Sequence, residues 1–227
     1  MISKDAERST LIREEDRRFL TKQFRKKLKK PVTLIVFTSS DKECTYCEKT
    51  VEVMDGISSL SEKIKTMKYS FENDKGMVEK YQVKRYPAII VTSDNMEDGR
   101  VVFYGLPSGY EFGSFIESIE SVSTGEPEIA DKAKEIILGI VEPVKISVYI
   151  TPSCQYCPRT STIVNKFAIL NHNIRSEIVE ILEFGNEDKI KSIEKVPYIN
   201  VNDRVEVIGT HTEEQFAKFV MEATRKK

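Results

Sequence analysis

The chain has 227 residues, which corresponds to one large domain or two small ones at roughly 150 residues per domain. Lys and Arg number 35 and Asp and Glu number 36, so the formal net charge is −1. A charge this close to zero creates no long-range field that would gather nucleic acid or anionic lipid. No stretch approaches 18 consecutive apolar residues, and residues 1–9 are too charged for a signal peptide. We therefore expect a cytoplasmic protein with no membrane or nucleic-acid partner.

The four cysteines form two Cys-x-x-Cys pairs, Cys44 with Cys47 and Cys154 with Cys157. Four cysteines are too few for a secreted scaffold held together by disulfides. Four thiolates can bind one zinc ion, but 106 residues lie between Cys47 and Cys154, whereas compact zinc sites have roughly 15–20. A cytosolic Cys-x-x-Cys pair after a strand is typical of a redox dithiol. The spacing favours redox chemistry over metal binding, and we predict neither a metal site nor a cofactor.

The sequence repeats at an offset of 110 residues. Each half contains a Cys-x-x-Cys pair, a tyrosine before the second cysteine, and a proline 43 residues after the first cysteine. These residues are Cys44, Tyr46 and Pro87 in the first half and Cys154, Tyr156 and Pro197 in the second. So many coincidences in the same order indicate two copies of one unit, which we place at residues 1–122 and 123–227.

The two halves predict the same order of elements. In the first half these are a helix at 11–30, a strand at 32–37, a helix whose apolar face runs from Cys47 to Ile64, a strand at 68–71, a helix at 75–81, two short strands after Pro87 and a helix around 112–119. In the second half they are a helix at 127–138, strands at 144–150 and 177–182, a helix at 187–193, two short strands after Pro197 and a helix around 216–220. The alternation predicts an α/β fold in which each unit is a central mixed sheet flanked by helices.

Two segments bear on how the units are joined and on their partners. Gly125 and Pro127 have the stop and start signals of consecutive helices, so the linker is short and the units are expected to pack together. The basic run at 25–30 ends a helix that begins with acidic residues at 14–16. Acids first and bases last match the helix dipole, so this run does not indicate nucleic-acid binding.

A strand, a Cys-x-x-Cys pair, a helix and a proline 43 residues after the first cysteine together resemble the thioredoxin fold. The tandem arrangement, with the sequences at 44–47, 103–112 and 151–158, resembles the glutaredoxin-like protein disulfide oxidoreductases of archaea and thermophiles over essentially the whole chain. The resemblance implies dithiol–disulfide exchange on protein substrates, with oxidase, reductase and isomerase activities, and reduction by a thioredoxin-reductase-type flavoprotein. Asp41 and Glu43, which crowd the approach to Cys44, depart from the family pattern.

The chemistry of exchange predicts a role for each cysteine. A thiolate attacks a substrate disulfide, and a second thiol resolves the resulting mixed disulfide. We place Cys44 and Cys154 at helix N-termini, where unpaired N–H groups and the helix dipole stabilise a thiolate. These two are the predicted nucleophiles, and Cys47 and Cys157 are the predicted resolving thiols. The alternative is that both pairs are structural.

The resemblance also implies roles for the two prolines. In the thioredoxin fold this proline is cis and faces the active site, which leaves the preceding backbone free to pair with an extended substrate. Pro87 and Pro197 are therefore expected to be cis, although without the resemblance both would be expected trans. Tyr86 and Val196 would then bind substrate peptide by strand addition.

The two sites are expected to differ in acidity. Acidic residues surround the first cysteine pair, partly offset by two lysines, whereas the second pair has no acid between 152 and 159 and has a nearby Arg159. The residues around the first pair are Asp41, Lys42, Glu43, Glu48 and Lys49. Like charge raises a thiol pKa and opposite charge lowers it, so Cys154 is predicted to be the more acidic thiol. If the side chains point away, the two thiols titrate alike.

Two questions remain open at this stage, one about Glu180 and one about the function of the whole protein. Glu180, in an otherwise apolar strand, is either a buried proton acceptor for Cys157 or, as the sequence favours, a strand-end carboxylate in water; Ser70 holds the corresponding place in the first half. The protein as a whole is either an oxidoreductase of protein disulfides or an electron carrier from a flavoprotein to a peroxiredoxin. A third possibility for the whole protein is a metal-binding scaffold without turnover.

Overall fold

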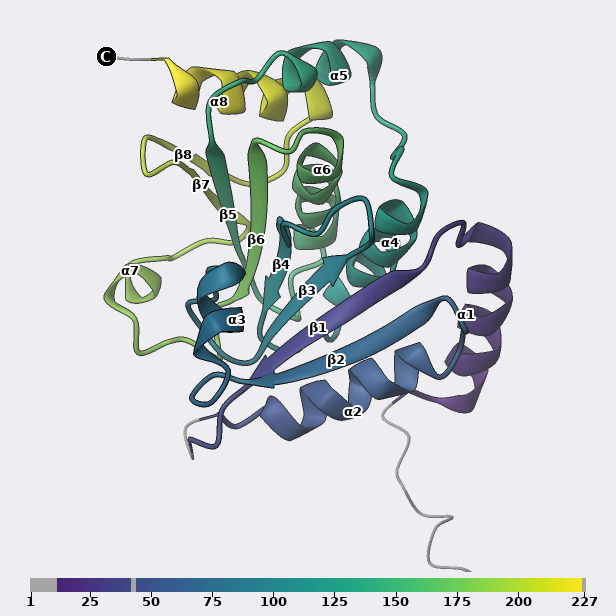
Figure 1. The fold of residues 1–227 in the computed structure, drawn as a ribbon. Helices are drawn as coiled ribbons and strands as arrows, with labels where there is room; N and C mark the ends of the chain where they lie inside the picture. The colour runs from purple at the N-terminus through teal and green to yellow at the C-terminus, as the bar shows by residue number, and fades with distance from the viewer. Residues whose placement is uncertain (1–11, 42–43, 226–227) are drawn as a thin grey trace, which may run out of the picture.

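The computed structural model describes residues 12–41 and 44–225, so the segment at 1–9 considered above as a signal peptide lies outside it. Eight strands form one sheet in the order β2-β1-β3-β4-β6-β5-β7-β8 (Figure 1). The first four are β1 (Val32–Thr38), β2 (Ile64–Ser70), β3 (Ala88–Thr92) and β4 (Val101–Tyr104). The other four are β5 (Val144–Ile150), β6 (Ile174–Glu180), β7 (Tyr198–Val201) and β8 (Val205–Ile208). The predicted mixed α/β fold is confirmed.

Helices cover both faces of this sheet. One face packs against α1 (Glu14–Lys27), α2 (Cys47–Ser58), α4 (Glu111–Thr124), α5 (Asp131–Leu138), α6 (Cys157–Leu170) and α8 (Glu213–Thr224). The other face packs against the short helices α3 (Lys75–Lys80) and α7 (Asp188–Lys191). The alternation of side chains along each strand supplies both cores, because successive residues point to opposite faces. In β6, for example, Ile178 belongs to the first core and Val179 to the second.

The halves join through their sheets. Strand β4 of the first half pairs in parallel with β6 of the second, with Val101 opposite Ser176 and Tyr104 opposite Val179. Across the whole sheet, the pairing places Val36 of β1 level with Val148 of β5, and both strands run in the same direction. Their carboxyl ends therefore lie at the same edge of the sheet, four strand positions or roughly 19 Å apart. The cysteine pairs, which follow these two strands, open at that edge.

The helix after the first cysteine pair is shorter than its apolar spacing predicts. It ends at Ser58, and Ile64 opens β2 instead of closing the helix. Leu60 packs against the core that contains Ile64, because the turn and the strand return to the same face of the sheet as the helix. Because Leu60 and Ile64 face the same core as the helix, their spacing in the sequence resembles a continuation of the helical period. Strand β2 correspondingly begins at residue 64 and not at 68.

Strand β6 also differs from its prediction, since it spans 174–180 and not 177–182. Its end is set by the Glu180 carboxylate, which accepts hydrogen bonds from the N–H groups of Leu182 and Glu183, both at 3.0 Å. These bonds fold the chain into a turn although its sequence remains apolar.

The segment between the units follows the predicted helix stop. Gly125, with a φ of +72°, ends α4, which continues through the boundary placed between residues 122 and 123. Pro127 does not begin the next helix, since α5 starts at Asp131. The predicted helix at 11–30 is observed over Glu14–Lys27, and residue 11 lies outside the described part.

The charges of α1 follow the helix dipole, and one of its basic residues is paired within the protein. Acidic residues fill the first turn of α1 and basic residues its last turn, as the dipole argument predicts. Lys27 Nζ forms an ion pair with Glu120 Oε2 at 2.7 Å. Within residues 12–41 and 44–225, no helix has the length and apolar character needed to cross a membrane.

Candidate active sites

The first candidate site is a disulfide between Cys44 and Cys47. Cys47 is the first residue of α2 and is 5% exposed, whereas Cys44 is partly exposed. The Ser39 N–H, at the end of β1, donates a hydrogen bond to Cys47 Sγ at 3.3 Å, and the Cys44 N–H donates to the Asp41 carbonyl at 3.0 Å. The outer sulfur is thus open to a partner while the inner sulfur is enclosed.

The second candidate site is a disulfide between Cys154 and Cys157. Cys157 is completely buried at the start of α6, and Cys154 is partly exposed. The Cys157 N–H donates a hydrogen bond to Cys154 Sγ at 3.1 Å, and the Cys154 N–H donates to the Thr151 carbonyl at 3.1 Å. Here the outer sulfur receives an N–H from the first turn of the helix.

The predicted helix start is corrected at both sites. The helices begin at Cys47 and Cys157, and the preceding cysteine occupies a turn in which its carbonyl accepts the N–H of the second cysteine. The nucleophile position therefore lies just before the helix. The N–H groups of a first helical turn still point toward that position, because they have no partner within the helix.

Both predicted cis prolines are confirmed. The Tyr86–Pro87 and Val196–Pro197 peptide bonds are cis. Each proline is buried and its carbonyl accepts an N–H, from Gly105 at 2.8 Å in the first half and from Gly209 at 2.9 Å in the second. The backbone N–H and carbonyl of Tyr86 and Val196 make no hydrogen bond to another described residue. Both residues are partly exposed.

The first site has carboxylates around it. The Tyr86 hydroxyl donates a hydrogen bond to Asp41 Oδ2 at 3.2 Å. Ser39 Oγ donates to Glu72, and this hydrogen bond lowers the pKa of that exposed carboxyl. The sequence prediction missed Glu72, which follows β2 and reaches the site across the sheet edge. Lys42 and Glu43, which entered the charge argument, lie outside the described residues.

The second site has one buried and one partly buried carboxyl. Glu180 is 2% exposed, and burial raises its pKa, so the expectation of a solvated strand-end carboxylate is wrong. Alternation along β6 places its side chain on the same face as Ile178, in the core that also contains Cys157. Glu183, which the sequence prediction also missed, accepts the Leu106 N–H at 2.7 Å, and burial raises its pKa to about 7.

A first-unit segment, residues 106–110, forms part of the second site. The Tyr110 N–H donates to the Pro152 carbonyl at 3.0 Å, two residues before Cys154. Gly109 has a φ of +58°, and a Cβ there would lie 2.3 Å from the Pro152 oxygen, so the approach requires glycine. Together with the bond from Leu106 to Glu183, these contacts fix the segment to the second unit.

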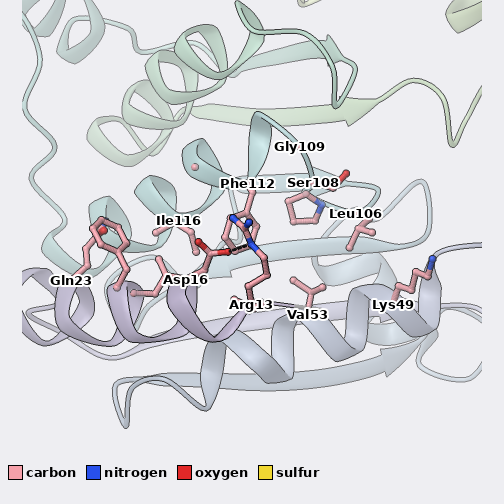
Figure 2. A pocket seen from close by; sticks show the side chains of 15 residues that line it. Arg13, Asp16, Gln23, Lys49, Val53, Leu106, Ser108, Gly109, Phe112 and Ile116 are labelled. Atoms are coloured by element: carbon pink, nitrogen blue, oxygen red, sulfur yellow. Dashed lines mark hydrogen bonds and ion pairs between the residues drawn. The ribbon is translucent and has the colours of Figure 1, made fainter. Parts of the chain in front are cut away.

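At each site a groove is lined in part by the first turn of the helix that follows the disulfide. The first, of about 690 Å³, lies between α1, α2 and residues 106–116, as the side chains in Figure 2 show, and includes Lys49 from the first turn of α2. The second, of about 740 Å³, lies between the starts of α4, α6 and α8 and includes Arg159. No group of three or more His, Cys, Asp or Glu side chains suited to a metal ion occurs in the described part of the chain.

Comparisons with known proteins agree with this geometry. The thioredoxin domain family model matches residues 144–221. The solved structure of a protein disulfide oxidoreductase from Aeropyrum pernix is 29% identical, superposes with a TM-score of 0.85 and covers 93% of each chain. The chain has the tandem thioredoxin fold. The resemblance to the archaeal protein disulfide oxidoreductases is confirmed. The same match supports a thioredoxin-like oxidoreductase with two Cys-x-x-Cys centres.

Two curated relatives are longer proteins. A "NADH dehydrogenase" of Ferdinandcohnia aciditolerans is 28% identical over 81% of this chain and 32% of its own length. A component of the alkyl hydroperoxide reductase of Pseudomonas aeruginosa is 27% identical over 70% of this chain and 32% of its own length. The chain thus spans about a third of the length of these two relatives.

Proposed function

We propose that the chain exchanges dithiols and disulfides with protein substrates at two sites, one in each of the units 1–122 and 123–227. The observation that carries this proposal is a disulfide that occurs twice in the same setting. In each, a partly exposed cysteine precedes a buried one at the start of a helix. A redox pair needs this arrangement, because one sulfur must meet a substrate while the other waits for the mixed disulfide.

Reduction of a substrate proceeds from the dithiol form. The thiolate of Cys44 or Cys154 attacks a substrate sulfur, forms a mixed disulfide and releases the other substrate sulfur as a thiolate. The thiol of Cys47 or Cys157 then loses its proton and attacks the mixed disulfide. This step releases the second substrate thiolate and leaves the protein disulfide seen in the structure. Two electrons pass from protein to substrate, and the reverse sequence oxidises a substrate dithiol.

The residues before and at the cis prolines are the proposed peptide contacts. The free backbone groups of Tyr86 and Val196 support this role, since an extended substrate can pair with them as an added strand. Pro87 and Pro197 fix these groups through their carbonyl bonds to Gly105 and Gly209. Such pairing reads the peptide backbone, which suits an activity on many protein disulfides, including isomerisation.

The test is reduction of insulin disulfides by the reduced protein, compared with the Cys44→Ser/Cys154→Ser variant. We expect the double variant to lose at least about a hundredfold in rate, because no outer thiolate remains. Retention of most of the activity would show that the proposed nucleophiles are wrong. Reactivation of scrambled ribonuclease by the wild-type chain tests isomerase activity separately.

A second candidate function is electron transfer to a peroxidase. The match to relatives that are named as parts of alkyl hydroperoxide reductases favours it. In this function a thioredoxin-reductase-type flavoprotein reduces the chain, and the chain reduces a peroxiredoxin by the same exchange steps. Coupled oxidation of NADPH by a flavoprotein reductase, the chain, a peroxiredoxin and hydrogen peroxide tests it, and a rate equal to that without the chain contradicts it.

A further inference from the structure

The groove beside the second disulfide combines elements of both units. Pro158 and Arg159, which directly follow Cys157, line it from α6, and Tyr110 lines it from the first unit. The backbone bond from Tyr110 to Pro152 holds this tyrosine beside the loop that carries Cys154. The Tyr110 residue is 59% exposed, so the groove presents an aromatic surface.

Most charges that line this groove already have partners. Glu117 forms an ion pair with Lys166 at 3.2 Å, Glu214 forms one with Lys218 at 2.8 Å, and Glu213 accepts the Ala130 N–H at 2.7 Å. Glu213 and Glu214 also lie in the first turn of α8, where the helix dipole favours a carboxylate. Arg159 is exposed and has no ion-pair partner among the residues in 12–41 and 44–225. Of the two basic side chains that line this groove, Lys166 is thus paired and Arg159 is available to a ligand.

The internal repeat points to the same position. The offset of 110 residues relates Arg159 to Lys49, so each unit has a basic residue two positions after its second cysteine. In each unit that residue lines the groove beside the disulfide. Lys49 Nζ lies 5.7 Å from the ring centre of Tyr46, whereas Arg159 has no such contact within the described residues. A basic residue therefore lines the groove at the equivalent position of both units.

We propose that the second groove binds the polypeptide that flanks the reactive cysteine of a substrate, and that it selects a flank with a carboxylate beside an apolar side chain. Arg159 pairs with the carboxylate, and Tyr110 and Pro158 contact the apolar side chain. This inference rests on the proposed function and adds its substrate class, which is protein disulfides with an acidic and apolar flank. Tyr110 thereby makes the first unit a part of the second site's specificity.

The experiment isolates the second site in the full-length Cys44→Ser/Cys47→Ser variant. Two peptide disulfides are compared that differ only in a Glu-Leu or a Lys-Leu sequence after the cysteine. We expect the Glu peptide to be reduced about fivefold faster, as the attraction of one exposed ion pair allows. Arg159→Glu should reverse the preference, and Lys134→Glu, the same charge change on the exposed side of α5, should leave it unchanged.

Further variants separate the possible results. Tyr110→Ala should lower kcat/KM for both peptides by about five- to tenfold through loss of apolar contact, and Tyr110→Phe should restore it. An equal rate for the two peptides, or an Arg159→Glu effect that is identical for both, overturns the inference, because Arg159 then acts only on the thiol. Reduction of neither peptide by the parent variant contradicts the proposed function itself.

Discussion

The two disulfides differ in which sulfur accepts a backbone hydrogen bond. At the first site the inner sulfur, Cys47 Sγ, accepts the Ser39 N–H. At the second site the outer sulfur, Cys154 Sγ, accepts the Cys157 N–H. On reduction, an N–H aimed at the outer sulfur stabilises the thiolate that attacks the substrate, whereas an N–H aimed at the inner sulfur stabilises the thiolate that later attacks the mixed disulfide. The same fold thus supports two different redox centres.

The surrounding charges strengthen this difference. The first site has Asp41 and Glu72 nearby, and both are tied to it by hydrogen bonds, from Tyr86 and from Ser39. The second site has Arg159 in the first turn of α6. Of its carboxyls, Glu180 is buried at the end of β6 and Glu183 is partly buried in the turn that follows. We infer that Cys154 is the better nucleophile, and four measurements can break or sharpen this comparison of the two sites.

The largest expected effect is on turnover. Cys154→Ser should lower the rate of insulin reduction by at least about tenfold, because the second site carries most of the flux, whereas Cys44→Ser should lower it less than about twofold. Initial rates at equal protein concentration provide the comparison. Equal losses in the two variants would mean that the sites contribute equally.

The next effect concerns the contact between the units. Gly109→Ala should lower the free energy of unfolding by roughly 2–4 kcal/mol, because the new Cβ meets the Pro152 carbonyl in addition to adopting a positive φ. Gly125→Ala is the matched control, since its φ is also positive but no atom lies within 4 Å of its Cβ, and it should cost about 1 kcal/mol. Urea unfolding measures both.

The same pair of variants also tests where the damage falls. In the Cys44→Ser/Cys47→Ser background, Gly109→Ala should slow reduction at the second site although residue 109 belongs to the first unit. Equal stability losses for the two glycine variants, together with unchanged second-site rates, would show that the 106–110 segment does not shape that site.

A smaller effect is expected on thiol ionisation. Variants that keep one cysteine pair each should show alkylation of Cys154 with a midpoint about one pH unit below that of Cys44, because one hydrogen bond to a thiolate is of this size. The rate of iodoacetamide modification against pH measures the midpoints. A midpoint for Cys44 equal to or below that of Cys154 would contradict the inferred difference.

The smallest effect is on the pH dependence of stability. Burial raises the pKa of Glu183 to about 7, and the neighbouring Glu180 carboxyl acts in the same direction. The folded chain therefore holds a proton that the unfolded chain releases, so this group's contribution to stability is present at low pH and is lost as pH rises toward and through 7. Relative to Glu183→Gln, the Tm of the wild type should fall by about 2–4 °C between pH 5 and pH 8.

Glutamine is a suitable replacement here, because its side-chain oxygen can still accept the Leu106 N–H. Thermal unfolding at several pH values compares the two proteins. Parallel Tm curves would show that Glu183 titrates as it does in the unfolded chain, and the carboxyl cluster would then not distinguish the second site.

Much of the site was predictable because its residues act close to one another in the sequence. The cysteine spacing, the strand before each pair and the repeat determine both redox centres, and the repeated proline spacing, through the family resemblance, predicts the cis peptides. The helix start was misplaced by three residues, because spacing does not show whether the first cysteine is in the helix or in the turn before it.

The contacts between the units were not predictable. Leu106 meets Glu183, and Tyr110 meets Pro152, only because β4 and β6 pair in parallel. The side-chain pattern of an edge strand does not indicate which strand pairs with it, because the pairing is made by backbone hydrogen bonds. Glu180 was misjudged for a related reason, as its carboxylate is satisfied by the turn that it creates.

The β4–β6 pairing also determines which strand edges would be exposed if the two units were separate proteins. In a separate first unit β4 would be an edge strand of the sheet, and in a separate second unit β6 would be one. Each edge strand would expose a row of unpaired N–H and carbonyl groups. Covalent linkage keeps the two edges at a high effective concentration, so they find each other before they find a strand of another molecule. Keeping both units in one chain thus protects these two edges from pairing with another molecule.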